Sequence, residues 1–550
     1  MHDIAGNYGT ILYLVQFFFA VIIGLYFWNL LKQDRGSKNA ISRESEREKK
    51  RLQAMQRIKL SEPLSSLTRP ATVEEIIGQE DGVAALKAAL CGPNPQHVII
   101  YGPPGIGKTA AARLVLDEAR KNSLSPFSTA AAFVEVDATI SRFDERSIAD
   151  PLIGSVHDPI YQGAGALGLA GIPQPKPGAV TKAHGGILFI DEIGELHPLQ
   201  MNKLLKVLEE RKVFLESAYY SPDDDNIPPH IHEIFKSGLP ADFRLVGATT
   251  RSPQEISPAI RSRCLEVFFR PLEAEEIVEI ARRALVKVGW LIEEEALQLV
   301  GQYATNGREA VNIIQLAVGL AQTGSEQLVT VPTVEKVFNN CNLTPRQRFK
   351  VNEYPQVGTV NGLALTGNVG QVMEIEVSVL ETEVAGGDFK VTGIIEEEEM
   401  QGGGKVYRRQ SMAVSAGQNV LTALRRMGLD PGHYDIHVNF PGGMPVDGPS
   451  AGISMGVAIY SAITNIPVDN LVAMTGEITV LGLIKPVGGI MAKVDAARRA
   501  GLKRVIIPAD NWLRIFDQYS DIEIITVNNF QQGLKAALAD YPIDLVRAVN

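Results

Sequence analysis

Hydrophobic and polar residues follow three different patterns along most of this 550-residue chain. Residues 61–271 alternate short apolar runs, rich in β-formers, with stretches of helical spacing; the runs lie at 97–102, 133–137, 187–192 and 243–250. This alternation is typical of an α/β domain with a mostly parallel sheet. Residues 272–345 repeat apolar positions every three or four residues, which predicts a lid made only of helices. Residues 346–550 are rich in glycine and mix strands with helices, which predicts an α+β domain.

The N-terminal residues have a pattern of their own. Residues 11–31, ILYLVQFFFAVIIGLYFWNLL, are apolar except for Gln16 and Asn29, and as a helix they would span about 30 Å of hydrocarbon. We therefore predict a transmembrane anchor within residues 1–31, followed by a charged linker over 32–60. The alternative is a cleaved signal peptide, but the basic region that should precede its apolar core and the small-residue cleavage site are both missing.

The charges around this segment predict its orientation. Eight Lys or Arg residues follow it between positions 32 and 51, and none precedes it. We therefore expect a single-pass protein of the cell membrane, and the positive-inside rule predicts that its C-terminal bulk is in the cytoplasm and its N-terminus outside.

The net charge and the cysteines of the chain exclude some kinds of binding partner and site. The formal net charge of -10 argues against a general nucleic-acid binder, so we expect no specific nucleic acid. The three cysteines Cys91, Cys264 and Cys341 are far apart in the sequence, which suits a reducing compartment and indicates neither a disulfide framework nor a zinc site. We expect all three to be packing residues.

A phosphate-binding motif follows the apolar run at 97–101. Its eight residues are Gly102, Pro103, Pro104, Gly105, Ile106, Gly107, Lys108 and Thr109. They fit G-x-x-x-x-G-K-[ST] and open a helical stretch, so backbone N–H groups and the helix N-terminus can surround phosphate oxygens. Lys108 is predicted to reach the terminal phosphates and Thr109 to ligate a metal ion, which makes ATP with Mg²⁺ the predicted cofactor.

The apolar run at 187–192 ends in two carboxylates. Asp191 is predicted to hold Mg²⁺ together with Thr109. Glu192 is predicted to polarise the water that attacks the terminal phosphate.

Three further motifs follow in the same order as in a known family. They are GATTR at 247–251, PAIRSRC at 258–264 and NGREA at 306–310. With the phosphate-binding loop and the acidic strand end, they make this region resemble the AAA+ ATPases.

The resemblance to AAA+ ATPases implies roles for three side chains. Thr250 would sense the γ-phosphate, Arg263 would be an arginine finger acting on the nucleotide of a neighbouring chain, and Arg308 would be the sensor of the lid. Thr249 remains the alternative for the sensor, and Arg261 the alternative for the finger. A finger that acts on a neighbour requires a ring.

A glycine-rich segment, DPIYQGAGALG at 158–168, carries Tyr161. Ring translocases present an aromatic pore loop at this place, so Tyr161 is a candidate for contact with the translocated chain. The alternative is a buried tyrosine in an ordinary loop, because glycine-rich loops also arise for local reasons.

Ser450 follows a predicted strand at 434–440 and the segment PGGMPVDGPSAG at 441–452. A helical stretch is predicted to begin at Ser450. The free N–H groups and the dipole of a helix N-terminus could stabilise a developing oxyanion beside an attacking serine. A serine that merely caps the helix would show the same pattern.

The motif PVDGPSAG, the run MTGEITVLGLIKPVGGI at 474–490 and Lys493 resemble the proteolytic domain of Lon-type proteases. The resemblance implies that Ser450 is the nucleophile and that Lys493, rather than Lys485, is the general base, with Thr475 as a partner that orients the lysine. An amine is a poor base at neutral pH unless its charged form is disfavoured. The apolar neighbours Ile490, Met491 and Val494 could desolvate it.

A motor, a Lon-type protease and a membrane span in one chain resemble the bacterial LonB branch of that family. The resemblance implies a homo-hexameric, ATP-dependent serine endopeptidase that unfolds, translocates and degrades cytoplasmic protein substrates. The alternatives are an AAA+ remodelling ATPase with a Lon-like scaffold domain and a membrane chaperone with weak proteolysis. The acidic run at 396–399 is expected to be a solvated loop without a specific role.

Overall fold

The computed structural model divides into two compact units, residues 1–67 and 68–550. The residues that it describes are 17–26, 28, 48–55, 57, 62–139, 150–157, 173–217, 220–224, 227–324, 326–346, 349–366, 369–383, 386–393, 397–402, 405–442 and 448–539.

The first unit is mostly helical where it is described. Residues 17–26, 28, 48–55 and 57 are helical, and α2 spans Leu64–Leu67. The large apolar side chains that are described between positions 17 and 28 are exposed. No helix among the described residues is both long and apolar enough to cross a membrane. The predicted span at 11–31 reaches beyond the described residues at both ends.

A five-stranded sheet forms the centre of the ATPase part, in the order β2-β5-β8-β1-β9. All of its neighbouring strands are parallel, as predicted for residues 61–271. The strands are β1 (His97–Tyr101), β2 (Phe133–Asp137), β5 (Ile187–Asp191), β8 (Arg244–Thr249) and β9 (Cys264–Phe268). Because the strands are parallel and the three central ones are mostly apolar and buried, both faces of the sheet must be covered.

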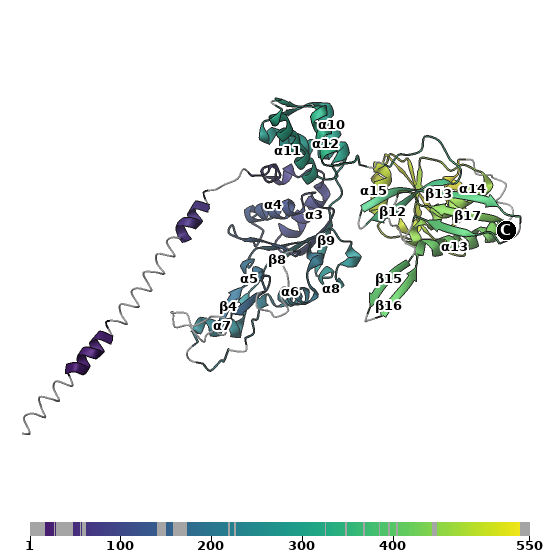
Figure 1. Ribbon diagram of the computed structural model, residues 1–550. Helices are drawn as coiled ribbons and strands as arrows, with labels where there is room; N and C mark the ends of the chain where they lie inside the picture. Colours follow the sequence, from purple (N-terminus) through teal and green to yellow (C-terminus); the bar gives the residue numbers. More distant parts are fainter. Residues whose placement is uncertain are drawn as a thin grey trace, which may run out of the picture. The chain divides into compact units, whose positions relative to one another are not determined.

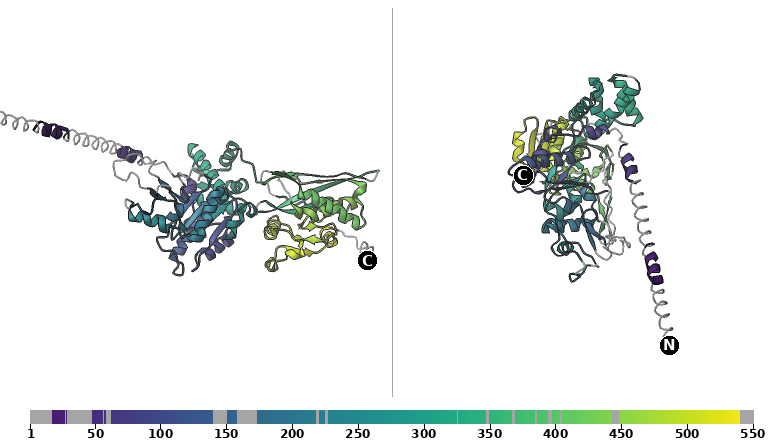
Figure 2. Two further views of the ribbon diagram at one scale, coloured as in Figure 1. Left: turned by 90° about the horizontal axis from the view of Figure 1, so that it is seen from below. Right: turned by 90° about the vertical axis from the view of Figure 1, so that its left-hand side faces the viewer.

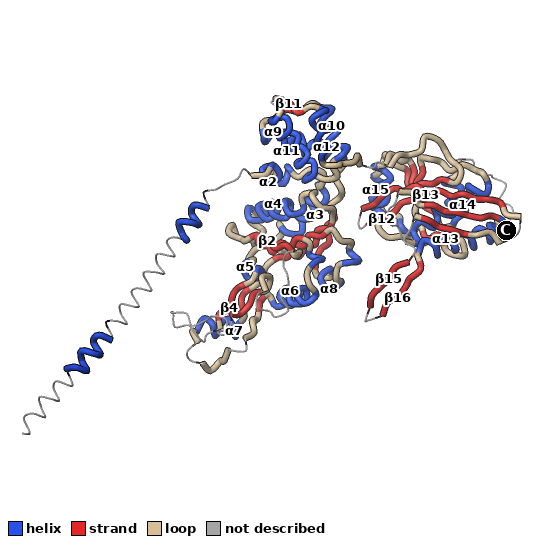
Figure 3. The backbone as a smooth tube through the Cα atoms, in the orientation of Figure 1, coloured by secondary structure: helices blue, strands red, loops and turns tan. Residues whose placement is uncertain are grey.

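Helices cover both faces of this sheet (Figure 1, Figure 3). One face carries α3 (Glu80–Leu90) and α4 (Lys108–Lys121). On the other face, buried residues of α5 (Ala179–Lys182) and α6 (Pro198–Glu210) pack against Ile99, Leu188 and Ile190 in one core. The remaining elements are β3 (Gly154–His157), β4 (Gln174–Pro177), β6 (Lys212–Val213), α7 (Pro229–Ser237), β7 (Leu239–Pro240) and α8 (Pro258–Arg261).

The lid consists of four helices and a small sheet. Figure 1 and Figure 2 show the helices gathered in a bundle of their own; they are α9 (Ala274–Val288), α10 (Glu294–Tyr303), α11 (Gly307–Thr323) and α12 (Val331–Asn340). The prediction of helices alone was wrong, because β10 (Leu291–Ile292) pairs in parallel with β11 (Leu328–Val329). Strands of two residues leave no periodic signal in a sequence.

The protease part is built on a seven-stranded mixed sheet in the order β14-β17-β13-β12-β18-β21-β22. This agrees with the predicted α+β class. The strands are β12 (Thr359–Thr366), β13 (Val369–Glu381), β14 (Phe389–Thr392), β17 (Tyr434–Asn439), β18 (Val472–Met474), β21 (Arg504–Pro508) and β22 (Glu523–Val527). A short hairpin of β19 (Glu477–Ile478) and β20 (Ile484–Lys485) lies outside it.

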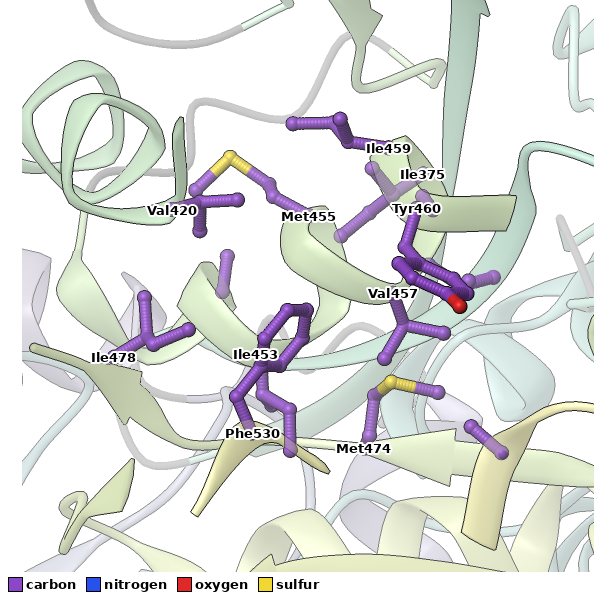
Figure 4. Close-up of a cluster of buried hydrophobic side chains, with 14 of the residues drawn as sticks. Ile375, Val420, Ile453, Met455, Val457, Ile459, Tyr460, Met474, Ile478 and Phe530 are labelled. Carbon is purple, nitrogen blue, oxygen red and sulfur yellow. The ribbon is translucent and has the colours of Figure 1, made fainter. Parts of the chain in front are cut away.

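Alternating side chains of this sheet enter two separate cores. Val472, Met474 and Ile506 face the core formed with α13 (Met412–Arg426), α14 (Gly452–Thr464) and α16 (Phe530–Ala537), part of which Figure 4 shows. Ala473 and Val505 face the opposite core, which contains α15 (Ile490–Arg499). The end of β18 therefore lies between α14 on one face of the sheet and α15 on the other.

Two local predictions were wrong. The acidic run is not a loop over 397–402, because β15 (Glu397–Gly402) pairs antiparallel with β16 (Lys405–Gln410), and this hairpin extends away from the seven-stranded sheet (Figure 1). Cys341 is exposed rather than packed. It continues the spacing of the buried residues Val334, Val337 and Phe338, but α12 ends at Asn340 and the chain then turns away from the core.

Candidate functional site

The phosphate-binding loop connects β1 to α4. Gly105 and Gly107 adopt φ of 73° and 97°, a left-handed conformation that glycine adopts without steric cost. Gly107 directly precedes the first helical residue, Lys108, so the free N–H groups of α4 face the loop. The Nζ atom of Lys108 donates to the carbonyl oxygens of Gly102 at 2.6 Å and Pro103 at 2.9 Å.

The first turn of lid helix α11 packs against this loop. A Cβ atom added at Gly105 would lie 2.5 Å from Oδ1 of Asn306 and 3.3 Å from Cβ of Arg308. Burial lowers the pKa of Lys108, and the positive charge of Arg308 adds to this effect. The negative charges of Glu192 and Asp191 counteract it. The structure thus brings together four of the charged residues that the sequence singled out: Lys108, Asp191, Glu192 and Arg308.

Thr250 and Glu192 are in direct contact. The backbone N–H and Oγ1 of Thr250 each donate to Oε2 of Glu192 at 3.1 Å. Thr249 is buried within β8, and its Oγ1 accepts from the N–H of Arg251 at 3.1 Å. Of the two threonines considered for the sensor, Thr250 is the one that reaches the carboxylate.

Arg263 and Arg261 have different surroundings. The guanidinium of Arg261 donates to Glu266 at 2.6 Å, and the hydroxyl of Tyr101 donates to the same carboxylate oxygen at 3.0 Å. The guanidinium of Arg263 pairs with the exposed Glu209 and donates to the carbonyl of Ala259 at 2.7 Å. Arg263 also lines a surface pocket of about 470 Å³, where a neighbouring chain could reach it.

Tyr161 and the rest of the glycine-rich segment lie outside the described residues. The segment is flanked by β3 and β4, which pair antiparallel from Gly154↔Pro177 to His157↔Gln174. The pore-loop assignment stays a prediction.

Ser450 lies in a short 3-10 turn, Pro449–Ala451, and not at the first residue of a helix as predicted. The α-helix begins two residues later, at Gly452, and Ala451 is the residue that precedes it. The Pro-Ser pair sets the turn because proline at the first helical position fixes φ for helical geometry. Ser450 is therefore not the cap of α14, which removes the main structural explanation for a serine here.

Thr475 connects Ser450 to Lys493. Its Oγ1 donates to the carbonyl oxygen of Ser450 at 3.3 Å and accepts from Nζ of Lys493 at 3.0 Å. The N–H of Gly476 also donates to the carbonyl of Ser450, at 2.9 Å, and the N–H of Thr475 donates to Ile506 at 3.1 Å. Thr475 follows the last residue of β18, so the end of this strand joins the two candidate residues.

Lys493 is buried, with 2% of its surface exposed, and Thr475 is fully buried. Desolvation lowers the pKa of Lys493 from 10.5 to about 8, because a low-dielectric environment disfavours the charged amine. Its predicted neighbours Ile490 and Val494 are buried in the same core. Lys485, the alternative, is an exposed residue of β20.

Gly370 is a residue of this site that the sequence did not reveal. A Cβ atom added to it would lie 1.8 Å from the carbonyl oxygen of Ala492. The backbone of β13 therefore lies directly against the backbone of α15, one residue before Lys493. Nothing in the pattern around Gly370 marks this contact, which joins positions far apart in the chain.

The first part of the chain has a phosphate-binding loop and a helical lid, and the second part has a buried lysine linked to a serine. Together they define the class of ATP-dependent serine proteases. The family model of the Lon protease (S16) C-terminal proteolytic domain matches residues 332–540. The model of magnesium chelatase, subunit ChlI, matches residues 72–223.

The names of curated relatives agree with the match to the Lon protease model. The chain is 60% identical over 531 residues to Lon protease 2 of Bacillus subtilis (strain 168), covering 96% of each protein. It is 31% identical over 442 residues to an archaeal Lon protease of Thermococcus kodakarensis, covering 72% of this chain and 65% of that protein. The chain belongs to the Lon protease family. Lon proteases act on protein substrates and form oligomeric rings, and their AAA+ modules use nucleotide with Mg²⁺.

Proposed function

We propose that this enzyme cleaves peptide bonds with Ser450 as nucleophile and Lys493 as general base. The observation that carries the proposal is the burial of Lys493 behind Thr475, which is itself bonded to the backbone of Ser450. A lysine with a pKa near 8 is partly neutral at physiological pH, and a neutral amine can accept a proton from a hydroxyl.

The proposed proton path uses the hydroxyl of Ser450 and the amine of Lys493. As Oγ of Ser450 attacks the substrate carbonyl, its proton passes to Nζ of Lys493, which later returns it to the leaving amine. Thr475 keeps the amine in place through its hydrogen bond. No histidine or carboxylate is needed for this path.

The ATPase site is proposed to hold ATP with Mg²⁺. The glycine loop, which lies at a helix N-terminus, fits a polyphosphate, with Lys108 on the phosphates and Thr109 and Asp191 on the metal ion. Glu192 would activate the attacking water and Thr250 would sense the γ-phosphate. Arg308 would read the nucleotide from the lid, whose first turn already contacts the loop.

Arg263 is proposed to act on the nucleotide of a neighbouring chain in a homo-hexameric ring. Its place in a surface pocket and its pairing with the exposed Glu209 support this role. Arg261 is instead bound to Glu266, a carboxylate that also accepts from the buried Tyr101. The ring would draw unfolded chains toward Ser450, with Tyr161 in contact with the translocated substrate.

We also propose that residues 1–31 anchor the enzyme in the cell membrane with its catalytic parts in the cytoplasm. The support is the apolar run at 11–31 and the basic residues that follow it. The other proposed boundaries are a linker at 32–60, the ATPase domain at 61–271, the lid at 272–345 and the protease domain at 346–550.

Substitutions of the two residues test the peptidase assignment. Ser450→Ala and Lys493→Ala should each abolish cleavage of a fluorogenic peptide, and the double variant should be no worse, because residues that act as one unit are not additive. Lys493→Arg should be equally inactive, since a guanidinium stays protonated. ATP hydrolysis should persist in all four.

Lys485→Ala is the matched control, because Lys485 is an exposed lysine eight residues before Lys493. This variant should cleave the peptide like the wild type. Cleavage by Ser450→Ala would refute the nucleophile. Cleavage by Lys493→Arg together with loss in Lys485→Ala would show that the wrong lysine was chosen.

A further inference from the structure

Glu192 has a backbone conformation that needs support from its surroundings. Its φ and ψ are 49° and 52°, a left-handed geometry that is unfavourable for a residue with a Cβ atom. Such a conformation persists only where neighbouring contacts over-determine it. Glu192 also precedes a 3-10 turn, Ile193–Glu195, and its carbonyl accepts from the N–H of Glu195 at 2.8 Å.

Two side-chain links join this turn to the end of β8. The first is the contact of Thr250 with the carboxylate of Glu192. The second is an ion pair between Arg251, the residue after Thr250, and Glu195, three residues after Glu192. Nε and Nη2 of Arg251 lie 2.8 Å and 2.5 Å from Oε1 of Glu195.

Glycine at position 194 makes room for the arginine. A Cβ atom added at Gly194 would lie 2.8 Å from Cδ of Arg251 and 2.9 Å from Cδ1 of Ile256. The aliphatic stem of Arg251 therefore crosses the turn directly. Arg251 is itself fixed at its backbone, since its N–H donates to Oγ1 of Thr249 in β8.

We propose that Arg251, through its ion pair with Glu195, is a positioning residue for ATP hydrolysis. The pair holds the 3-10 turn against the end of β8, and the turn holds Glu192 in its left-handed conformation within reach of Thr250. Arg251 acts through the protein and does not touch the nucleotide. The proposal rests on the proposed role of Glu192 as activator of water.

Steady-state ATPase assays on the full chain test this role. Arg251→Ala and the nearly isosteric Glu195→Gln should each lower kcat about tenfold, the order of effect expected when a catalytic group is displaced slightly. The KM for ATP and the affinity for a non-hydrolysable ATP analogue should stay within twofold. The double variant should equal either single variant, because both substitutions break the same link.

Arg283→Ala is the matched control. Arg283 forms a 2.8 Å ion pair with Glu279 in the lid, and the side-chain exposures of 45% and 42% resemble the 38% and 41% of Arg251 and Glu195. This variant should hydrolyse ATP like the wild type. Thermal unfolding of all variants should show a native fold.

Three results would overturn the proposal. The first is wild-type turnover in Arg251→Ala. The second is a loss in Arg251→Ala that Glu195→Gln does not reproduce, which would mean direct contact with the nucleotide. The third is weakened ATP binding that accounts for the loss.

Glu192→Gln is assayed in parallel to separate the role of Glu192 as activator of water from the role of Arg251 as positioning residue. It should lose about 10²-fold or more in turnover, as expected for a missing general base. If it keeps turnover within twofold, the role of Glu192 fails. If it is inactive while Arg251→Ala is active, only the positioning role fails.

Discussion

Lys493 is an ionisable side chain held in an apolar core. Val494 and Ala497 from its own helix and Ala473 from β18 belong to this core. Its amine has a hydroxyl, rather than a carboxylate, as hydrogen-bond partner. Desolvation is accordingly the cause of its lowered pKa, and this lowering is what makes a lysine useful as a base at neutral pH.

Peptide cleavage should therefore depend on pH through this amine. The value of kcat/KM should rise with pH, reach half of its maximum near pH 8 and level off above about pH 9, because only the neutral amine accepts the proton of Ser450. The measurement is the rate of peptide hydrolysis from pH 6 to 10 at constant ionic strength. A flat profile between pH 6 and 9 would contradict the assignment.

The same burial should weaken the protease domain at neutral pH. The folded-state pKa near 8 lies below the ordinary value of 10.5, so the unfolded chain binds the proton more tightly. The penalty is fully present below pH 8, at about 3 kcal/mol, and disappears as pH rises toward 10.5. Lys493→Met should thus raise the free energy of unfolding at pH 7 by about 2–3 kcal/mol, and by little at pH 10.

Scanning calorimetry at the two pH values measures this difference on the protease transition. Lys485→Met serves as the control, because that lysine is exposed and its replacement should change the transition little at either pH. An equal effect of Lys493→Met at pH 7 and pH 10 would contradict the explanation by desolvation.

The position of α15 depends on its contact with β13. The two elements approach so closely at Gly370 that any side chain would collide with the helix backbone, which cannot yield as a flexible side chain could. Lys493 is the next residue on that helix, so the strand determines where the amine lies relative to Thr475.

Gly370→Ala should accordingly lower peptide cleavage at least tenfold, because even a small displacement of a catalytic group is costly. ATP hydrolysis should continue. Gly319→Ala in α11 is the control, since its Cβ atom would meet nothing within 4 Å and alanine favours a helix. Wild-type cleavage by Gly370→Ala would show that α15 can shift without disturbing the site.

The apolar run at residues 11–31 predicts that the enzyme is bound to a membrane. The full-length protein should sediment with membranes and resist carbonate extraction, because about 20 apolar residues suffice to span the hydrocarbon core. A shortened chain that begins at Arg51 should remain in the soluble fraction. Recovery of both forms in the soluble fraction would contradict the anchor and favour an assembly role for the apolar run.

Much of the chain could be interpreted from local patterns. The strands β1, β2, β5 and β8 lie within a residue or two of the predicted runs, since apolar spacing and β-propensity act over neighbouring residues. The phosphate-binding loop was recognisable because its glycines, lysine and threonine occupy fixed places within a stretch of eight residues, 102–109. Ser450 and Lys493 stood out by motif, and their catalytic roles stay proposals.

Other features arise from residues that are distant in the sequence. Thr475 meets Lys493 across 18 positions because helix α15 lies beside the end of β18. Arg251 meets Glu195 across 56 positions because β5 and β8, the strands that precede these residues, are neighbours in the sheet. The burial of Lys493, and with it the pKa near 8, results from how α15 packs against the sheet. Periodicity and motif spacing carry no record of such contacts, because they report which face of an element is apolar and not what packs against it.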